Sequence, residues 1–401
     1  MKMKIKTYIL FLFFFFSFFN IYAFSSFELR VPLNHNNLSE GYSFIQYQIV
    51  SDFDPSIETI LIYSDPIDDY FPEVDWSEIL RGKFNVVKII GRHNFDSFFK
   101  NVSKAGEINW SRSYMIFNQY QIAMDIETVR ATLMKENKVS FITGSSSATA
   151  IFQYLSMFPE KVKSVICINP LLFDLQKNLS FKKFEIDDPL FYKNTSPESL
   201  FKFGYYANFI EKNINAEEKN NFYHQSLFTF NSYSYLFFNK QITNERSRSL
   251  ALKVRFFEHT YNLQENKTMP EEGKNSLYSW MYIESRPLWL SHSQIPFSVV
   301  GVFYDKGEIY SGKILIIGSA QNWLIHPKSF EALAEFYPTS TLFMVNDGHA
   351  MLAVKEGSLL QNFVFAYLLD DQKMKISSFT ALRKEGLIFQ NQYSSDKIPE
   401  R

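Results

Sequence analysis

The 401-residue chain contains a single cysteine, Cys167, so it can form no intrachain disulfide. Cys167 lies in the apolar run Val165 to Ile168, with no basic neighbour that would activate its thiol, and we expect it to be buried and structural. The fold must therefore be held together by burial of its core alone.

Long runs of one charge are also missing, because 41 basic and 42 acidic side chains leave a net charge of −1. Such a chain offers no electrostatic surface for nucleic acid. The sequence also lacks C-x-x-C, H-E-x-x-H, G-x-G-x-x-G and Walker-type glycine motifs. We therefore expect no nucleic-acid partner and no metal or other cofactor.

Only one long apolar run occurs, and it lies at the N-terminus. Three lysines precede the run Ile9 to Phe19, and Ala23 follows it as a cleavage point typical of a secretory signal. A retained transmembrane anchor is the alternative, although the run is shorter than the roughly 20 residues that span a bilayer. We expect cleavage, export to the periplasm or the extracellular space, and a mature chain that starts near Phe24 with no membrane partner.

Short apolar runs, each followed by polar or turn-forming residues, have the length of strands buried on both faces. They are Thr59–Tyr63, Asn85–Ile90, Val139–Thr143, Val165–Ile168, Lys313–Ile317 and Thr341–Val345. Between the second and third runs, Ile122, Ile126, Val129 and Leu133 recur at helical spacing. The alternation of strands and helices predicts an α/β fold with a doubly wound, mostly parallel sheet.

The alternation stops after Asn169-Pro170, and strand character returns at Phe297 to Phe303. The stretch between is rich in Phe and Tyr and prone to form helices, which indicates a helical cap inserted into one sheet. We divide the chain into a signal peptide (1–23), the first part of the core (24–174), the cap (175–290), the second part of the core (291–371) and a polar, peripheral tail (372–401).

The strongest motif is Gly144-Ser145-Ser146-Ser147-Ala148, between the predicted strand that ends at Thr143 and a helix-like segment. The pattern G-x-S-x-A is that of a nucleophile elbow, whose strained turn needs small residues two before and two after the reactive serine. On this spacing we predict Ser146 as the nucleophile and the N–H of Ser147 as one oxyanion donor. Ser145 and Ser147 are rivals, and a serine-rich helix cap without catalysis is the alternative.

A catalytic serine needs a base, and the candidate is His349, which follows the last predicted strand. A loop at the carboxyl end of that strand is where a triad histidine reaches over the sheet. His93 and His326 also follow strands and are its rivals.

The order of these motifs along the chain, with the serine elbow before the histidine, resembles that of the α/β-hydrolase fold. Within this fold it resembles the proline iminopeptidase-like serine hydrolases. The resemblance extends from about Phe27 to Leu369. Besides the elbow, the segments that carry it are Arg30–Asn36, similar to the family's VPLDH start, Phe84–Ser97, Asp125–Arg130 and Phe158–Val162.

The resemblance implies a role for Glu258. In that family a cap glutamate in an E-x-x-Y segment binds the free α-amino group of the substrate, and Arg255–Tyr261 is similar. A carboxylate is a sensible partner for a buried ammonium group. The alternative is an ordinary glutamate on a helix surface.

The chain departs from the family's pattern at the oxyanion loop. After the strand Thr59–Tyr63 it reads Ser64 to Asp69, without a glycine. The N–H of Ile67 or Asp68 is the available substitute for the second oxyanion donor, and loss of one such donor costs about 3 kcal/mol.

The family's triad acid is also missing, since the position of its G-x-x-D aspartate reads Gln321-Asn322. We rank Asp174, which follows the strand after the elbow helix, as the first candidate for the acid. Gln321 or Asn322, acting as amide substitutes, come second, and a site with no orienting group comes third. Asp347 is too close to His349 in sequence.

The sequence thus predicts a serine hydrolase that forms an acyl-enzyme on a small-molecule or short-peptide substrate. By resemblance it would be an aminopeptidase or amidase, with an esterase or lipase-like enzyme as the alternative within this class. A hydrolase-fold binding protein that has lost catalysis is the rival from another class.

Overall fold

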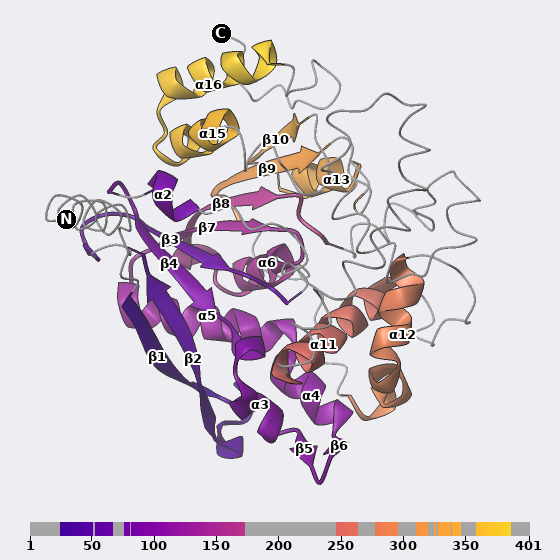
Figure 1. The fold of residues 1–401 in the computed structure, drawn as a ribbon. Helices are drawn as coiled ribbons and strands as arrows, with labels where there is room; N and C mark the ends of the chain where they lie inside the picture. The colour runs from indigo at the N-terminus through magenta and orange to yellow at the C-terminus, as the bar shows by residue number, and fades with distance from the viewer. Residues whose placement is uncertain are drawn as a thin grey trace, which may run out of the picture.

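The structure is a computed structural model, and it describes the following residues: 25–50, 53–66, 76–80, 82–172, 246–263, 277–295, 310–319, 325, 328–337, 339–345 and 358–385. Eight described strands form one sheet in the order β1-β2-β4-β3-β7-β8-β9-β10 (Figure 1). Their bounds are β1 Ser25–Pro32, β2 Tyr42–Ile49, β3 Thr59–Tyr63, β4 Asn85–Ile90, β7 Val139–Gly144, β8 Val162–Ile168, β9 Lys313–Ser319 and β10 Ser340–Val345.

The sheet is mostly parallel, which confirms the predicted fold class. The six strands from β4 to β10 pair in parallel, and β2 joins β4 antiparallel and carries β1, also antiparallel, at the edge. All six strands predicted from the short apolar runs are present. β1 and β2 were not predicted: β2 alternates exposed and buried residues, and the first four residues of β1 are exposed.

Helices cover both faces of the sheet. The described helices are α2 Trp76–Leu80, α3 Asp96–Lys100, α4 Trp110–Phe117, α5 Gln119–Met134, α6 Ser147–Met157, α11 Arg246–Leu263, α12 Leu277–Leu290, α13 Lys328–Phe336, α15 Ser358–Leu368 and α16 Gln372–Lys384. Short elements lie between them: η1 Leu38–Glu40, η3 Arg92–Asn94, η4 Pro159–Lys161, η5 His292–Gln294 and the small hairpin of β5 Ser103–Lys104 and β6 Glu107–Ile108.

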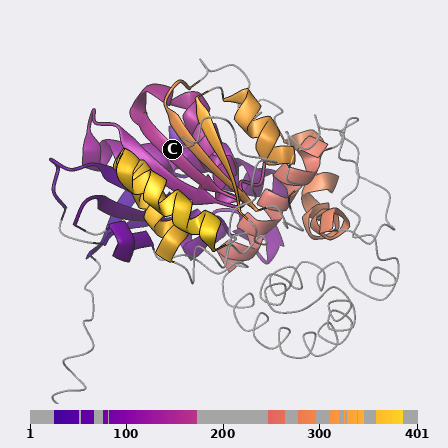
Figure 2. The ribbon, with the colours of Figure 1, turned by 90° about the horizontal axis from the view of Figure 1, so that it is seen from above.

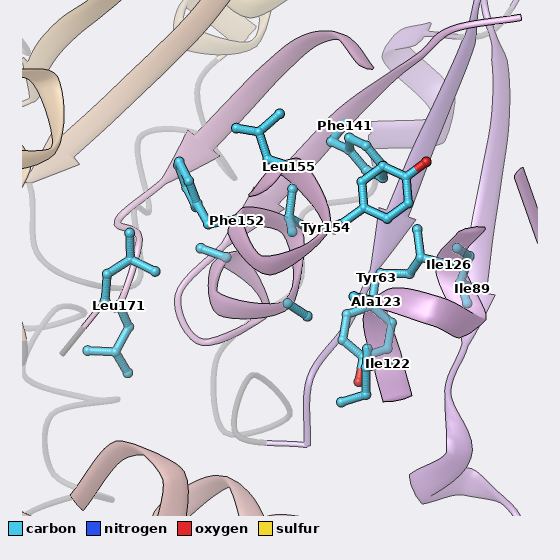
Figure 3. Close-up of a cluster of buried hydrophobic side chains, with 14 of the residues drawn as sticks. Tyr63, Ile89, Ile122, Ala123, Ile126, Phe141, Phe152, Tyr154, Leu155 and Leu171 are labelled. Carbon is cyan, nitrogen blue, oxygen red and sulfur yellow. The ribbon is translucent and has the colours of Figure 1, made fainter. Parts of the chain in front are cut away.

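Alternate residues of each central strand enter two separate cores, as the period of a strand requires. On β3, Leu61 and Tyr63 join a cluster with α5, α6 and α13. Figure 3 shows part of this cluster, with side chains of α5 and α6 against the sheet. Ile60 and Ile62 join the opposite cluster with α2, α15 and α16. The sheet is therefore buried on both sides.

The segment that we expected to be a peripheral tail contains α16. Asp371 caps this helix by accepting a hydrogen bond from the backbone N–H of Met374 at 2.9 Å. Its Leu382 is fully buried, and α16 packs against α15 across one face of the sheet (Figure 2). The helix was missed because few of its residues are apolar.

The stretch expected to form the cap contributes α11 and α12 to the described structure. The two helices pack together, and α11 also contacts η3, α3 and α4 (Figure 1). Rings of Tyr114, Phe257, Tyr261 and Trp289 fill the junction, with centroids 5.3–5.6 Å apart. The end of this insertion is thus anchored to the core by aromatic packing.

A buried arginine joins three of the segments that suggested a family. The guanidinium of Arg92 donates to both carboxylate oxygens of Asp125, at 2.6 and 2.8 Å. It also donates to the carbonyls of Pro32 and Leu33 at 2.8 and 2.7 Å. The entry segment, the turn after β4 and helix α5 are therefore held as one unit.

In the part of the chain that the structure describes, no helix combines the length and hydropathy needed to cross a membrane. The predicted signal peptide and the expected strand at Phe297–Phe303 lie outside the described residues.

Candidate active site

The turn between β7 and α6 is strained at Ser145. Ser145 has a φ of 42°, whereas Ser146 has helical angles, with φ −74° and ψ −24°. The positive φ that we expected at Ser146 is therefore found one position earlier, at its rival Ser145. Which of the serines is the nucleophile stays a prediction.

Backbone hydrogen bonds hold Ser145 in this conformation. Its N–H donates to the carbonyl of Ile168 at 3.0 Å, and its own carbonyl accepts from the N–H of Leu171 at 2.9 Å. The neighbouring Gly144 lies so close to β8 that an added Cβ would stand 3.0 Å from the carbonyl oxygen of Ile168. The end of β8 and the residues directly after it therefore hold the turn in place.

The other two serines of the triplet use their hydroxyls inside the protein. The hydroxyl of Ser146 donates to Oδ1 of Asp65 at 2.9 Å. The hydroxyl of Ser147 donates to the carbonyl of Gly144 at 2.6 Å. Since a hydroxyl has one proton to donate, both protons are already given to internal acceptors. These two serines shape the turn.

Asp65 follows β3 in the loop that lacks a glycine, and its carboxylate bridges the elbow to helix α11. Oδ1 accepts from Ser146, and Oδ2 accepts from Nε of Arg255 at 2.7 Å. The side chains of Asp65 and Arg255 are both fully buried. The role of this carboxylate was not predicted from the sequence, where the loop stood out only for its lack of glycine.

Arg255 has further partners on α6 and on its own helix, α11. Nη2 donates to the hydroxyl of Thr149 in the first turn of α6, and Nη1 donates to the carboxylate of Glu258. Burial opposes the charge of Arg255, but the carboxylates of Asp65 and Glu258 outweigh it, so the pKa of Arg255 is raised above its usual value. Removing one partner from such a buried ion pair costs about 3–5 kcal/mol.

Glu258 is buried within this ion-pair network. Besides Arg255, its carboxylate accepts from the backbone N–H of Gln119, at the start of α5, at 3.0 Å. Burial raises the pKa of Glu258 to about 7, against the lowering effect of the Arg255 charge. The network thus joins α5, α6, α11 and the loop after β3.

Asn169, at the carboxyl end of β8, ties the next strand to the same edge. It has a φ of 47°, and its side-chain oxygen accepts from the N–H and the hydroxyl of Ser319, at 2.8 and 2.9 Å. Asparagine tolerates this left-handed conformation better than most residues. The carboxyl ends of β3, β7, β8 and β9 are therefore cross-linked around the strained serine.

A family model described as alpha/beta hydrolase fold matches residues 107–356, which is more than half of the chain. The chain belongs to the alpha/beta hydrolase fold family. A comparison with curated proteins found no match.

Solved structures similar to this alpha/beta hydrolase share little of its sequence. Epoxide hydrolases from metagenomes of hot environments are 11% identical, with a TM-score of 0.45 over 86% of this chain and 98% of theirs. The 2-hydroxy-6-oxo-6-phenylhexa-2,4-dienoate hydrolase of Rhodococcus sp. strain RHA1 is 11% identical, with a TM-score of 0.41 over 86% and 99%. An epoxide hydrolase of Bacillus megaterium is 11% identical, with a TM-score of 0.41 over 81% and 97%.

Several predicted site residues of this alpha/beta hydrolase lie outside the described residues. They are Ile67, Asp174, Gln321, Asn322 and His349, together with the rival His326. Their roles stay predictions. Within the described ranges, no group of three His, Cys, Asp or Glu side chains is arranged to hold a metal ion.

The rival base His93 lies in the described part of the alpha/beta hydrolase. Burial, followed by the charges of Arg248 and Arg255, lowers the pKa of His93 to about 3. One of its ring nitrogens is 2.9 Å from the side-chain nitrogen of Asn94. A general base works best with a pKa near the operating pH, so His93 is poorly suited to that role.

Glu258 is buried, so it is not the exposed helix residue of our alternative. Its carboxylate is already paired with Arg255 and with the N–H of Gln119. Glu258 therefore belongs to an internal ion-pair network, and its role as a ligand for a substrate amine stays a prediction.

Proposed function

We propose that this alpha/beta hydrolase is an exported serine hydrolase that forms an acyl-enzyme on Ser145. The observation that carries the proposal is the φ of 42° at Ser145, at the carboxyl end of β7 and directly before α6. Non-glycine residues keep such a conformation at a cost of about 1–3 kcal/mol and cluster at active sites. The positive end of α6 also favours a developing negative charge beside this serine.

In the proposed reaction, Oγ of Ser145 attacks the carbonyl carbon of the substrate while His349 takes the serine proton. The oxyanion is stabilised by backbone N–H groups at the start of α6, those of Ser146 and Ser147. The C–O or C–N bond then breaks, and the leaving group receives the proton from His349. A water molecule that His349 deprotonates attacks the acyl carbon, and Ser145 recovers its proton.

The other residues of this mechanism are predicted from the sequence alone. Asp174 is our first choice for the acid that orients His349, with Gln321 or Asn322 as amide substitutes. The N–H of Ile67, in the loop after β3, is proposed as a further oxyanion donor beside those of Ser146 and Ser147. Each follows a strand of the sheet or lies in the loop after β3, where the carboxyl ends of parallel strands meet.

For the substrate, we favour a small ester over a peptide with a free N-terminus. The aminopeptidase reaction implied by the proline iminopeptidase-like resemblance needs a carboxylate that is free to bind the amine, and Glu258 is paired with Arg255. Cleavage of p-nitrophenyl butyrate but not of proline-naphthylamide is the expected result. The reverse preference would restore the aminopeptidase.

Labelling with a fluorophosphonate probe tests catalysis itself. We expect the wild type to be labelled, Ser145→Ala to take no label, and Ser146→Ala to be labelled more slowly but to completion. A wild type that takes no label would favour the second candidate, a hydrolase-fold binding protein. The loop after β3, which has no glycine to form the usual oxyanion site, supports that candidate.

A further inference from the structure

We propose that Arg255 and Asp65 are positioning residues for the reaction: their ion pair fixes Ser146, the residue after the nucleophile, in place of a glycine-rich loop. The inference rests on the proposed function of Ser145. It concerns two buried charged side chains that the mechanism above does not use.

The first route from Arg255 to the elbow passes through a carboxylate. Nε of Arg255 donates to Oδ2 of Asp65 at 2.7 Å, and Oδ1 of Asp65 accepts the hydroxyl proton of Ser146 at 2.9 Å. All three side chains are fully buried. This route holds the side chain of Ser146.

The second route passes through a hydroxyl. Nη2 of Arg255 donates to Oγ1 of Thr149, and that hydroxyl donates to the backbone carbonyl of Ser146 at 2.7 Å. This route holds the backbone of Ser146. A planar guanidinium with several fixed donors can serve both routes at once, whereas a lysine ammonium cannot.

The two routes converge on the residue whose N–H lies next to the proposed nucleophile. An oxyanion donor is effective only when it points to the place where negative charge develops, and small displacements are costly. Arg255 belongs to α11, in the returning part of the insertion, while Ser146 belongs to the elbow. The ion pair therefore makes the geometry of the site depend on the seating of α11.

The test compares Asp65→Asn, Arg255→Met and the double variant with the wild type. Asp65→Asn keeps an oxygen that can accept the Ser146 proton but offers no charge to Arg255. We expect each single variant to lower the fluorophosphonate labelling rate and kcat by roughly 10- to 100-fold, with KM within about twofold of the wild type. Because Asp65 and Arg255 act through the same ion pair on Ser146, the double variant should be no slower than the slower single variant.

Arg130→Met is the matched control. Arg130 is also a buried arginine in an ion pair, with Nε 2.7 Å from Glu127, but it caps the end of α5 through the carbonyls of Lys135 and Asn137. We expect it to lower the melting temperature as Arg255→Met does and to leave the labelling rate unchanged. A general loss of stability would affect both variants alike.

Two results would overturn the positioning role while leaving Ser145 as nucleophile: labelling at the wild-type rate in Asp65→Asn and Arg255→Met, or effects that multiply in the double variant. If Arg255→Met shows no cooperative unfolding transition, the labelling rate of Ser146→Ala tests the positioning role instead, because that variant removes only one hydroxyl. A several-fold slower rate in Ser146→Ala supports the role, and an unchanged rate contradicts it. A wild type without label would instead overturn the proposed function.

Discussion

Strain at one residue separates the three adjacent serines. Ser145 has a φ of 42°, a conformation that an L-residue adopts at a cost, while Ser146 and Ser147 belong to the start of a regular helix. Two backbone hydrogen bonds to β8 and the chain after it keep Ser145 there. Glycine adopts positive φ freely, so its absence at this position indicates that a side chain is needed.

Replacing Ser145 by glycine should therefore stabilise the protein. We expect Ser145→Gly to raise the free energy of unfolding by about 1 kcal/mol, since relief of strain exceeds the loss of backbone entropy. Ser146→Gly is the control, because Ser146 is helical and bonded to Asp65, and it should lower stability by about 1 kcal/mol or more. Urea unfolding measures both. Equal destabilisation in the two variants would contradict the account.

The stability of the protein should depend on pH through Glu258. Burial raises the pKa of Glu258 to about 7, whereas a glutamate in the unfolded chain has a pKa near 4.5. Between these values the folded protein keeps a proton that the unfolded chain has lost. The contribution of Glu258 to stability is therefore present at low pH and is lost as the pH rises from 4.5 to 7, by on the order of 3 kcal/mol.

The measurement is the difference in free energy of unfolding between the wild type and Glu258→Gln across this range. The glutamine does not titrate, so the wild type should lose stability relative to the variant as the pH rises. The buried His93 affects stability in the opposite direction. Because its pKa is lowered in the folded protein, the free energy of unfolding falls as the pH drops below 6.5. That effect is common to both proteins and cancels. A flat difference would contradict a raised pKa.

At the scale of elements, the sequence predicted what hydrophobic runs can reveal. The six strands buried on both faces read as continuous apolar runs, and all six are present. β2 was missed because its residues alternate between buried and exposed, a pattern that a search for continuous apolar runs passes over. β1 and α16 were missed because few of their residues are buried, so hydropathy carries little signal there.

The packing of α16 can be tested by a buried and an exposed substitution in the same helix. Leu382 is fully buried, while Lys384, two residues later, is exposed. We expect Leu382→Ala to lower the free energy of unfolding by about 2–3 kcal/mol and Lys384→Ala to change it by less than about 0.5 kcal/mol. If the two variants unfold alike, α16 is a peripheral tail, as its composition suggested.

At the scale of the whole molecule, the candidate site is assembled from distant parts of the chain. Asp65, Ser145 and Arg255 come from the first strands, the centre of the sheet and the end of the insertion. The serine motif could be found from local spacing, although the residue with the positive φ could not. The partnership of Asp65 with Arg255 was beyond prediction, because 190 residues separate the two and only the fold brings them together.

The export that we propose for this chain predicts a defined N-terminus. β1 begins at Ser25, two residues after the expected cleavage point at Ala23, so cleavage there keeps every described residue of β1. When the full chain is expressed with its own N-terminus in a bacterium, we expect the intact mass of a protein that starts at Phe24. A full-length protein that remains in the membrane fraction would show that the segment is retained as an anchor.

Ser145 and Ser146 can be distinguished as nucleophiles by finding which serine becomes modified. After reaction with a fluorophosphonate, tandem mass spectrometry of the peptide that contains Ser145, Ser146 and Ser147 can assign the phosphonyl group to one of them. The account predicts the modification on Ser145 alone, with none in Ser145→Ala. Modification of Ser146 in the wild type, or a labelled Ser145→Ala, would contradict it.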